Sequence, residues 1–318
     1  MHDVITIGSA TVDVFAVISK RLKEINVGDK VLVEAIAFET GGGGVNAAVG
    51  LSRMGLNTAF LGKLGHDLNA FKILHELKKE KVHVIKTHAS EYPTSYSFIL
   101  KSKKEQDRVL FTYKGASDHL NYNDFEKSEL KTKWIYMATM MKGSFKTCNK
   151  IADYAKKHNI KLMFNPSTYL AAKGRFYLRK ILNATTILVL NRSEAKLLLN
   201  AKTDHLPALA KGLYRIGPKL VIITEGAKGV AAYDGRELYT LPAYKVKVVS
   251  TTGAGDAFAS GFLAGIIHHN DIVHAMELGM ANAASVIGYY GTKNRLLTYI
   301  RAKKFINKRR EKVFIRRL

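Results

Sequence analysis

The residues best suited to chemistry are the turn Gly-Ala-Gly-Asp at 253–256. Val246, Val248 and Val249 precede it and predict the end of a buried β-strand. From Ala257 onward, an almost unbroken series of small and apolar residues predicts a helix buried on all sides. A glycine turn at the start of such a helix forms an anion site. The backbone can approach closely there, and free N–H groups and the helix dipole point at the anion.

Asp256 ends this turn and does not fit a site that only binds an anion, because a carboxylate repels a phosphate. Its position favours a second task, namely accepting the proton of a hydroxyl group that attacks the phosphate. The alternative is that Asp256 caps the helix and the glycines only turn the chain. The turn by itself does not decide between these interpretations.

The longer segment 250–263 resembles the C-terminal signature of the PfkB family of carbohydrate kinases, the ribokinase-like kinases. In that family the Gly-Ala-Gly-Asp turn holds the transferring phosphate, and its Asp is the catalytic base. The resemblance implies that Asp256 is the base and that the amides of Gly253, Ala254 and Gly255 stabilise the phosphate. The commonest family form begins with Asp-Thr, whereas the first position here is Ser250.

Length and composition suit a large α/β protein. The 318 residues allow one domain with an appendage, or two domains, and 47% hydrophobic residues exclude wholesale disorder. No apolar run reaches the ~18 residues that cross a bilayer, and the first residues lead directly into a strand pattern without a signal peptide. Cys148 is the only cysteine, so no intrachain disulfide can form. These features predict a cytoplasmic protein with no membrane partner.

The charge is unusual, because 50 Lys and Arg against 26 Asp and Glu give a formal net charge of +24. Such a surplus suits nucleic acids, anionic membranes or anionic substrates such as nucleotides. The basic residues are spread along the chain without a recognisable DNA- or RNA-binding motif, so we do not expect a nucleic acid partner. In the basic tail, Phe305, Ile306, Val313 and Phe314 predict a final helix with a solvated basic face. A nucleic-acid or partner surface is the alternative for this tail.

A second glycine-rich segment, TGGGGVNAAVGLSRMG at 40–55, predicts a helix over 45–54. A flexible connector is the alternative, because each glycine loses much backbone entropy on ordering. The segment resembles the family's N-terminal signature, a glycine pair followed by Asn at the start of a helix. The resemblance implies that Gly41, Gly42 and Asn46 hold the sugar, together with Asp13 after the first strand. Gly43 stands where ribokinases usually carry Lys.

Two segments, about 12–38 and 92–114, predict strands outside the main pattern. Residues 95–100 alternate in character, as in a sheet with two distinct faces. In ribokinase-like kinases these segments form a small β-sheet lid over the sugar, and lids of this kind often make the dimer contact. The resemblance implies a single kinase domain over 1–318, a lid inserted in it, and a homodimer through the lid. A lid would exclude water, which competes as phosphoryl acceptor.

From Trp134 the chain alternates short apolar strands with helices, which indicates a parallel sheet covered on both faces. Ligands of such sheets bind at the carboxyl ends of the strands. Asn165, Asn191, Thr224 and the turn at 253–256 all follow predicted strands. The predicted fold class is α/β, a ribokinase-like three-layer fold with a mostly parallel central sheet and a small β-sheet lid.

Asn191 and Glu194 match the family's Asn-x-x-Glu motif, which organises Mg²⁺ and phosphate, usually through water. The alternative is that Glu194 only stabilises the first turn of the helix that starts there. Thr-x-Gly-x-x-Gly at 224–229 contacts the nucleotide by resemblance. The nucleotide-binding residues implied in this way are Asn191, Thr224, Gly226, Gly229, Thr252 and Asn282.

A monovalent cation is a doubtful cofactor. Many ribokinase-like enzymes are activated by potassium, whose ligands include the Asp that opens the signature and carbonyls of a later loop. Ser250 cannot supply a full negative charge, and the later loop brings Lys293 and Arg295 near the ion's place. Arg295 is the better candidate to take over the ion's electrostatic role, because it cannot lose its charge. We therefore expect little activation by potassium.

The resemblance extends from the first strand to about Gly291. It implies transfer of the terminal phosphate of ATP, with Mg²⁺, to a hydroxymethyl group of a sugar, with ribose as the first expectation. A nucleoside kinase acting on adenosine, inosine, guanosine or cytidine is the close alternative, and fructose and keto-deoxy sugar acids stay open. A non-catalytic nucleic-acid-binding or regulatory protein on a kinase fold is the alternative of another class. Asp256 and the Asn-x-x-Glu motif argue against it.

Overall fold

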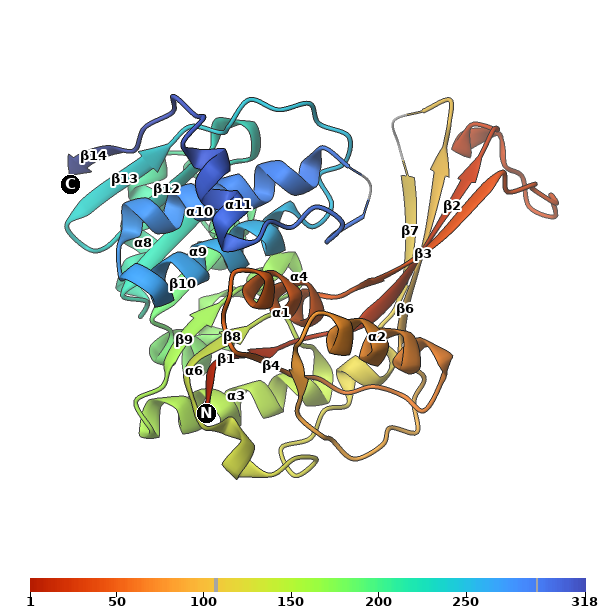
Figure 1. The fold of residues 1–318 in the computed structure, drawn as a ribbon, viewed down its shortest axis with the longest axis horizontal. Coiled ribbons are helices and arrows are strands. Elements are labelled where there is room, and N and C mark those ends of the chain that lie inside the picture. The colour runs from red at the N-terminus through yellow and green to blue at the C-terminus, as the bar shows by residue number, and fades with distance from the viewer. Residues whose placement is uncertain (106–107, 290) are drawn as a thin grey trace.

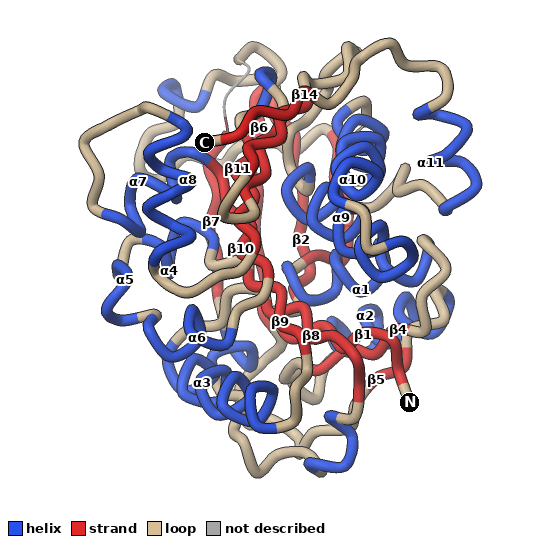
Figure 2. Tube along the Cα trace, turned by 90° about the vertical axis from the view of Figure 1, so that its left-hand side faces the viewer, coloured by secondary structure: helices blue, strands red, loops and turns tan. Residues whose placement is uncertain are grey.

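The structure is a computed structural model, and it describes residues 1–105, 108–289 and 291–318. A large sheet covered by helices on both faces makes up the body, and a smaller sheet extends from one side of it (Figure 1). Seen from the side, the body has three layers, helix, sheet and helix (Figure 2). The expected three-layer α/β fold is confirmed.

Within the part of the chain that the structure describes, the large sheet contains ten strands. Their bounds are β1 His2–Ile7, β4 Thr58–Leu61, β5 His83–Val84, β8 Thr132–Met137, β9 Lys161–Phe164, β10 Ile187–Asn191, β11 Leu220–Thr224, β12 Val230–Tyr233, β13 Glu237–Leu241 and β14 Phe314–Arg317. Their order is β14-β13-β12-β11-β10-β9-β8-β1-β4-β5. Every neighbouring pair from β5 to β11 is parallel, and β12, β13 and β14 extend the sheet antiparallel. The sheet is therefore mostly parallel, as predicted.

The helices divide between the two faces of this sheet (Figure 2). On one face lie α1 Gly43–Arg53, α2 Leu68–Lys79, α9 Ala254–His269, α10 Ile272–Ile287 and α11 Tyr299–Ile306. On the other lie α3 Lys142–Lys157, α4 Ser167–Ala171, α5 Gly174–Tyr177, α6 Arg179–Ala184, α7 Arg192–Leu199 and α8 Leu206–Arg215. Short 3₁₀ helices occupy Leu22–Glu24, Gly115–Asp118, Lys127–Leu130 and Gly226–Lys228. Within the described residues, none of these helices is long and apolar enough to cross a membrane.

The central strands are apolar on both sides because both faces of the sheet are covered. In β8, Trp134 and Tyr136 pack in the core on the α9 side, while Ile135 and Met137 pack in the core on the α3 side. Adjacent residues of a strand point to opposite faces. Continuous apolar runs such as this one therefore place a core on each side of the sheet.

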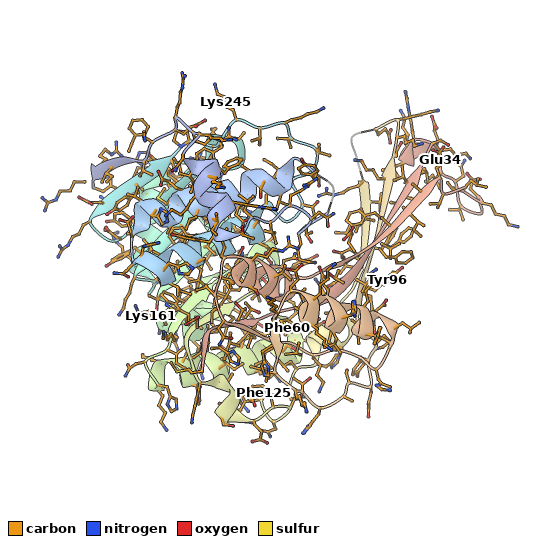
Figure 3. All side chains as sticks on the ribbon, viewed as in Figure 1. Glu34, Phe60, Tyr96, Phe125, Lys161 and Lys245 are labelled. Atoms are coloured by element: carbon orange, nitrogen blue, oxygen red, sulfur yellow. The ribbon has the colours of Figure 1, made fainter. Side chains whose placement is uncertain are left out.

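The small sheet contains β2 Thr11–Ile18, β3 Ala35–Gly41, β6 Ser95–Ser102 and β7 Arg108–Tyr113, in the order β3-β2-β6-β7. Its base packs on the body, where Val12 and Val14 meet Val45 of α1 and Ile73 of α2. Figure 3 shows Phe60 within the body and Glu34 at the far end of the small sheet. The two chain segments predicted as strands outside the main pattern form this sheet.

The prediction of a buried strand at Val246 to Val249 is wrong. No strand covers residues 242–253, and Val248 is 57% exposed. The backbone N–H groups of Val249 and Ser250 both donate to the carbonyl of Ile287, at 2.7 and 3.1 Å, instead of pairing with a neighbouring strand. Val246 and Val248 line a cavity, so the apolar pattern reflects a ligand-sized space and not a sheet.

The prediction of one final helix in the basic tail is also wrong. α11 ends at Ile306, and Phe314 begins β14, which pairs antiparallel with β13. An edge strand presents unpaired N–H and C=O groups, and the chain end satisfies those of β13. This pairing partner lies far away in sequence, so local periodicity does not reveal it.

The glycine-rich segment is not a connector. Gly41 ends β3, Gly42 precedes α1, and the helix begins at Gly43, two residues earlier than predicted. A Cβ on Gly44 would lie 2.8 Å from the Cα of Gly8 and from the ring of Phe60. Close packing of the first helical turn on the end of β1 therefore offsets the entropy that these glycines lose on ordering.

Candidate active site

The Gly-Ala-Gly-Asp turn lies at the start of α9, as predicted. Gly253 adopts φ +83°, and a Cβ there would lie 2.7 Å from the Cα of Thr292, so the position requires glycine. A Cβ on Gly255 would meet nothing within 4 Å. The first turn of α9 therefore opens onto space at its positive end, which is the arrangement of an anion site.

The side chain of Asp256 accepts a hydrogen bond from a residue of the glycine-rich segment. The side-chain N–H of Asn46 in α1 donates to Asp256 Oδ2 at 2.8 Å. Burial raises the pKa of Asp256 to about 6, with a smaller contribution from the carboxylate of Glu194, whereas the Asn46 bond and the charge of Lys293 oppose the rise. A carboxyl group with a pKa near neutrality suits a general base at physiological pH.

The residues predicted to hold the acceptor gather at the base of the small sheet. Asp13 lies on β2 opposite Glu39 of β3 and beside Ser97 of β6, which gives it a hydrogen bond. A Cβ on Gly41 would overlap Asp13 Oδ2, so any larger residue there would displace the Asp13 carboxylate. Gly42 has φ +93° and adjoins α1, which carries Asn46. Burial raises the pKa of Asp13.

A cavity of about 610 Å³ lies beside the start of α9. Three predicted nucleotide residues, Thr224, Gly226 and Gly229, line it together with Ala254 and Gly255. Most of its wall is apolar, from residues that the sequence analysis did not assign to a site: Tyr244, Val246, Phe258, Met280, Ala283, Ala284 and Ile287. An apolar cavity next to an anion site suits a nucleotide, with the base in the cavity and the phosphates at the turn.

Asn282 does not line this cavity, although it was predicted to bind the nucleotide. It is fully buried, donates to the carbonyl of Ala257 at 2.9 Å and accepts from the N–H of Leu297 at 2.9 Å. These bonds tie α10 to α9 and to the following loop. The next residues, Ala283 and Ala284, reach the cavity instead.

A hollow of about 340 Å³ adjoins the same site. Asn191 and Ser193 at the start of α7 line it together with Thr224 and Gly226, which also border the larger cavity. The predicted residues Asn191, Thr224 and Gly226 are therefore brought together. The carboxyl ends of β10 and β11 meet here, as expected for a parallel sheet.

Glu194 is a capping residue in this structure. Its Oε2 accepts from the Asn191 N–H at 2.9 Å, the Asn191 Oδ1 accepts from the Glu194 N–H at 2.9 Å, and Oε1 accepts from Thr168 Oγ1 at 3.1 Å. In the described parts of the chain, no group of three or more His, Cys, Asp or Glu could hold a metal. A single carboxylate suits Mg²⁺ that keeps several waters and is bound mainly by substrate phosphates. The residues fit that ion, and the role of Glu194 toward it stays a prediction.

Thr252 lies just before the turn and contacts the small sheet. Arg108 of β7 donates through Nη1 to Thr252 Oγ1 at 3.3 Å. A cation of the small sheet thus lies beside the turn that is predicted to hold the phosphate. The sequence analysis missed this link, because the two residues are 144 positions apart.

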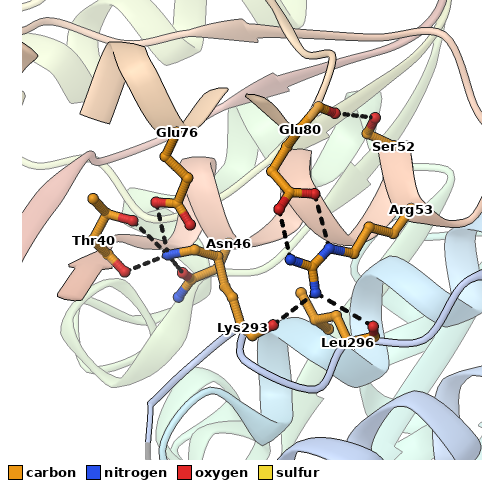
Figure 4. Close-up of polar contacts among 8 residues, drawn as sticks. All are labelled: Thr40, Asn46, Ser52, Arg53, Glu76, Glu80, Lys293 and Leu296. Carbon is orange, nitrogen blue, oxygen red and sulfur yellow. Dashed lines mark hydrogen bonds and ion pairs between the residues drawn. The ribbon is translucent and has the colours of Figure 1, made fainter. Parts of the chain in front are cut away.

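The loop after α10 brings only one of its two predicted cations to the site. Lys293 points inward and approaches Asn46 Oδ1 with its Nζ at 3.4 Å, whereas Arg295 lies on the ring of Tyr289 at 4.5 Å (Figure 4 shows Lys293). The preference for Arg295 is therefore not supported. The direction of a side chain in a loop has no periodicity, so the sequence could not indicate it.

A helix start that opens onto space, a carboxylate with a raised pKa and a cavity of nucleotide size are together the arrangement expected of a phosphotransferase. A family model described as pfkB family carbohydrate kinase matches residues 1–298. The chain therefore belongs to the PfkB family of carbohydrate kinases, and it is an ATP-dependent kinase of the ribokinase type.

The curated relatives that it resembles differ in acceptor. An ATP-dependent 6-phosphofructokinase of Thermoanaerobacterium thermosaccharolyticum is 26% identical over 299 residues, covering 91% of this chain and 89% of that protein. A nucleoside kinase of Methanocaldococcus jannaschii is 27% identical over 274 residues, covering 85% and 86%. A ribokinase of Bacillus subtilis is 28% identical over 306 residues, covering 94% and 97%.

Two solved structures share the fold. The ribokinase of Thermotoga maritima superimposes with a TM-score of 0.84 at 21% identity and covers 97% of this chain and 100% of that chain. The nucleoside kinase of Methanocaldococcus jannaschii superimposes with a TM-score of 0.80 at 24% identity and covers 96% and 99%. At these identities the likeness shows the fold alone.

Proposed function

We propose that the chain phosphorylates a hydroxymethyl group of a sugar, with ribose as the first candidate. The observation that carries this proposal is the contact between Asn46 and Asp256, which joins the predicted acceptor residues to the predicted base at 2.8 Å. In the proposed step the acceptor oxygen attacks the terminal phosphorus of ATP. The bond between that phosphorus and the bridging oxygen breaks, and ADP leaves with this oxygen. Asp256 takes the proton of the acceptor hydroxyl.

In this proposal the remaining residues position the reactants or neutralise the charge of the phosphates. Asp13 and Asn46 bind acceptor hydroxyls, and the amides at 253–255 stabilise the phosphoryl group during transfer. Mg²⁺, when bound with ATP, neutralises charge on the phosphates. Asn191 and Glu194 would hold it through water.

A nucleoside is the second candidate acceptor. A hollow of about 640 Å³ lies between the small sheet and the body. Its lining is partly apolar, with Phe15, Val17 and Ile36 from the small sheet and Val248 from the body. A pentose alone has no apolar face to match such residues, whereas the base of a nucleoside does.

The proposal includes a homodimer through the small sheet, which would act as a lid. One face of that sheet exposes large apolar side chains on both outer strands, Phe38 on β3 and Phe111 and Tyr113 on β7. An apolar surface of this kind is typical of an interface between protein chains. Location in the cytoplasm and the lack of a nucleic acid partner stay predictions.

A substrate panel tests the proposal. Pentoses, hexoses and nucleosides are each offered with ATP and Mg²⁺, and release of ADP and the phosphorylated acceptor are measured. Preference for free ribose supports the first candidate, and preference for a nucleoside supports the second. Binding of mixed DNA or RNA that weakens with salt, without ATP turnover on any acceptor, would instead favour the non-catalytic alternative.

A further inference from the structure

Lys293 is a buried cation that the proposed reaction does not use. It lies in the loop between α10 and α11 and is 4% exposed. Its Nζ donates to the carbonyl of Thr40, to Thr40 Oγ1 at 2.8 Å and to Asn46 Oδ1 at 3.4 Å (Figure 4). Three acceptors match the three N–H bonds of an ammonium group.

Hydrogen bonds from α1 hold the backbone of the loop that carries Lys293. Arg53 of α1 donates through Nη1 to the carbonyl of Lys293 at 3.0 Å and to that of Leu296 at 3.4 Å. The same guanidinium forms a two-bond pair with Glu80, at 2.8 and 2.6 Å. Such pairs hold a planar group in one orientation. The backbone of Lys293 is therefore held rigidly, and its side chain is aimed at Asn46.

Within the described ranges of the chain, Lys293 forms one close ion pair. Glu76 of α2 places Oε2 at 3.6 Å from the Nζ, and among the described residues this buried oxygen has no hydrogen-bond donor. Burial lowers the pKa of Lys293, and the charges of Glu76, Asp13 and Glu39 oppose this. An ammonium group in such a place is costly unless it is paired and hydrogen-bonded. Because the cost of desolvation cancels much of the stability that a buried ion pair provides, a role in the site accounts better for this arrangement than a contribution to folding stability does.

The contacts lead from Lys293 to the base through a single amide group. Asn46 Oδ1 accepts from Lys293 and from Thr292 Oγ1, at 3.1 Å for the latter, while Asn46 Nδ2 donates to Asp256 Oδ2. With two donors on its oxygen, the amide can only present its N–H₂ group to the carboxylate. Rotation by half a turn would place two oxygens together and two donors together.

We propose that Lys293 is a positioning residue, whose ammonium group fixes the amide of Asn46 so that this amide holds Asp256 as a charged, correctly aimed carboxylate. The inference rests on the proposed role of Asp256 as the base. Lys293 also acts through space, because its charge opposes the rise in the pKa of both Asp256 and Asp13. One buried cation thus lowers the pKa of both Asp13, which is proposed to bind the acceptor, and Asp256, the proposed base.

Other charged and titratable groups act on the same residues. Those near Asp256 are Lys293, Glu194 and Tyr136, and those near Lys293 are Glu76, Glu80, Asp13 and Glu39. Glu76 acts on Lys293 and is not among the groups that shift Asp256. Removing Lys293 together with the charge of Glu76 therefore changes the base without leaving Glu76 as a buried carboxylate that has lost its ion-pair partner.

The test uses Lys293→Met and the double variant Lys293→Met/Glu76→Gln, which keeps the test possible if the single variant fails to fold. The matched control is Lys63→Met/Asp124→Asn. Lys63 is also buried, and it pairs with Asp124 at 2.6 Å without contacting the proposed site. Melting temperature, ATP affinity, and kcat and kcat/KM from about pH 5 to about pH 9 are measured for each protein.

We expect the acidic limb of the pH profile to move up by ~1 to 2 pH units in the Lys293 variants, because the base loses a nearby positive charge. At pH 7 this shift alone should lower kcat by ~2- to 10-fold, and loss of the fixed Asn46 amide should add to the decrease, while ATP affinity changes little. The control should lower the melting temperature and leave the profile in place. An unmoved profile in the double variant, with a lowered melting temperature alone, would show that Lys293 is only structural.

Asp256→Asn, measured in parallel, separates this inference from the proposed function. If Asp256→Asn retains near-normal turnover, the proposed base is wrong and the inference fails with it. If Asp256→Asn is inactive while the Lys293 variants keep the native profile, the base stands and only the role of Lys293 is refuted.

Discussion

The raised pKa of Asp256 makes activity at low pH a direct test of the proposed base. Burial raises the pKa of this carboxyl group to about 6, well above the usual range of an aspartate. A general base works only when it is ionised. Lowering the pH through 6 therefore removes the working form of the site, while carboxyl groups with ordinary pKa values stay charged.

The size of the effect follows from this pKa. One pH unit below it, about one molecule in ten retains an ionised base, and each further unit costs about another factor of ten. The effect on stability has the opposite sign. Because the folded pKa is raised, the folded state binds the proton more tightly, so this group destabilises the fold above about pH 6 and stops doing so below the unfolded value. Loss of activity near pH 5 therefore does not reflect unfolding at this group.

The assay measures kcat/KM for the acceptor at saturating ATP and Mg²⁺ across this range, with the melting temperature followed in the same buffers. We expect a single proton-dependent limb near pH 6. Asp256→Asn should lower turnover by ~2 to 4 orders of magnitude and leave ATP affinity equal or improved. A flat native profile down to about pH 4.5, or near-normal turnover of Asp256→Asn, would refute the assignment of the base.

Three further changes test other parts of the site. Glu194→Gln should raise the Mg²⁺ concentration needed for half-maximal rate more than it raises the acceptor concentration needed. A lower melting temperature with unchanged Mg²⁺ dependence would leave Glu194 with its capping role alone, worth ~0.3 to 1 kcal/mol. Gly255→Ala should keep or slightly raise the melting temperature, because its Cβ meets nothing within 4 Å and glycine is costly in a helix, yet it should weaken ATP use by filling the space beside the phosphates. Gly28→Ala, at φ +91° in an open loop, is the control: backbone strain should lower its melting temperature and leave ATP use unchanged, and equal activity of both variants would contradict the phosphate site. Potassium should activate little relative to sodium or a bulky organic cation at equal ionic strength, because Ser250 lacks a full charge and Lys293 brings one; a large, saturable, potassium-specific increase would overturn this expectation.

The parts of the fold that could be predicted are those with a local cause. The start of α9 and its glycine turn follow from residue types that admit few other backbones, and the parallel strands follow from short apolar runs between helices. Even the convergence of Asn191 and Thr224 was predictable, since parallel strands end at the same edge of a sheet.

The features that escaped prediction depend on partners distant in sequence. Phe314 begins a strand that pairs with β13, whose outer edge would otherwise be unpaired. Val248 is exposed beside a cavity instead of lying in a strand. Asn282 serves the packing of α9 on α10, although it matches a ligand residue by pattern. Lys293 could be placed near the site from sequence, but its direction is decided by Arg53, 240 positions away.

The position of Asp13 on the small sheet has a consequence for how acceptor is captured. β2 follows β1 after only three residues, and Asp13 belongs to the small sheet, whereas Asn46 belongs to a helix packed on the body. A change in the angle between the small sheet and the body would therefore separate these two residues, which are proposed to bind the acceptor. Only one orientation satisfies both, so acceptor binding selects that orientation from those available. Measured acceptor affinity is then the product of an intrinsic affinity and the fraction of molecules already in that orientation. Substitutions at the base of the small sheet that touch no ligand should change apparent affinity through this fraction alone.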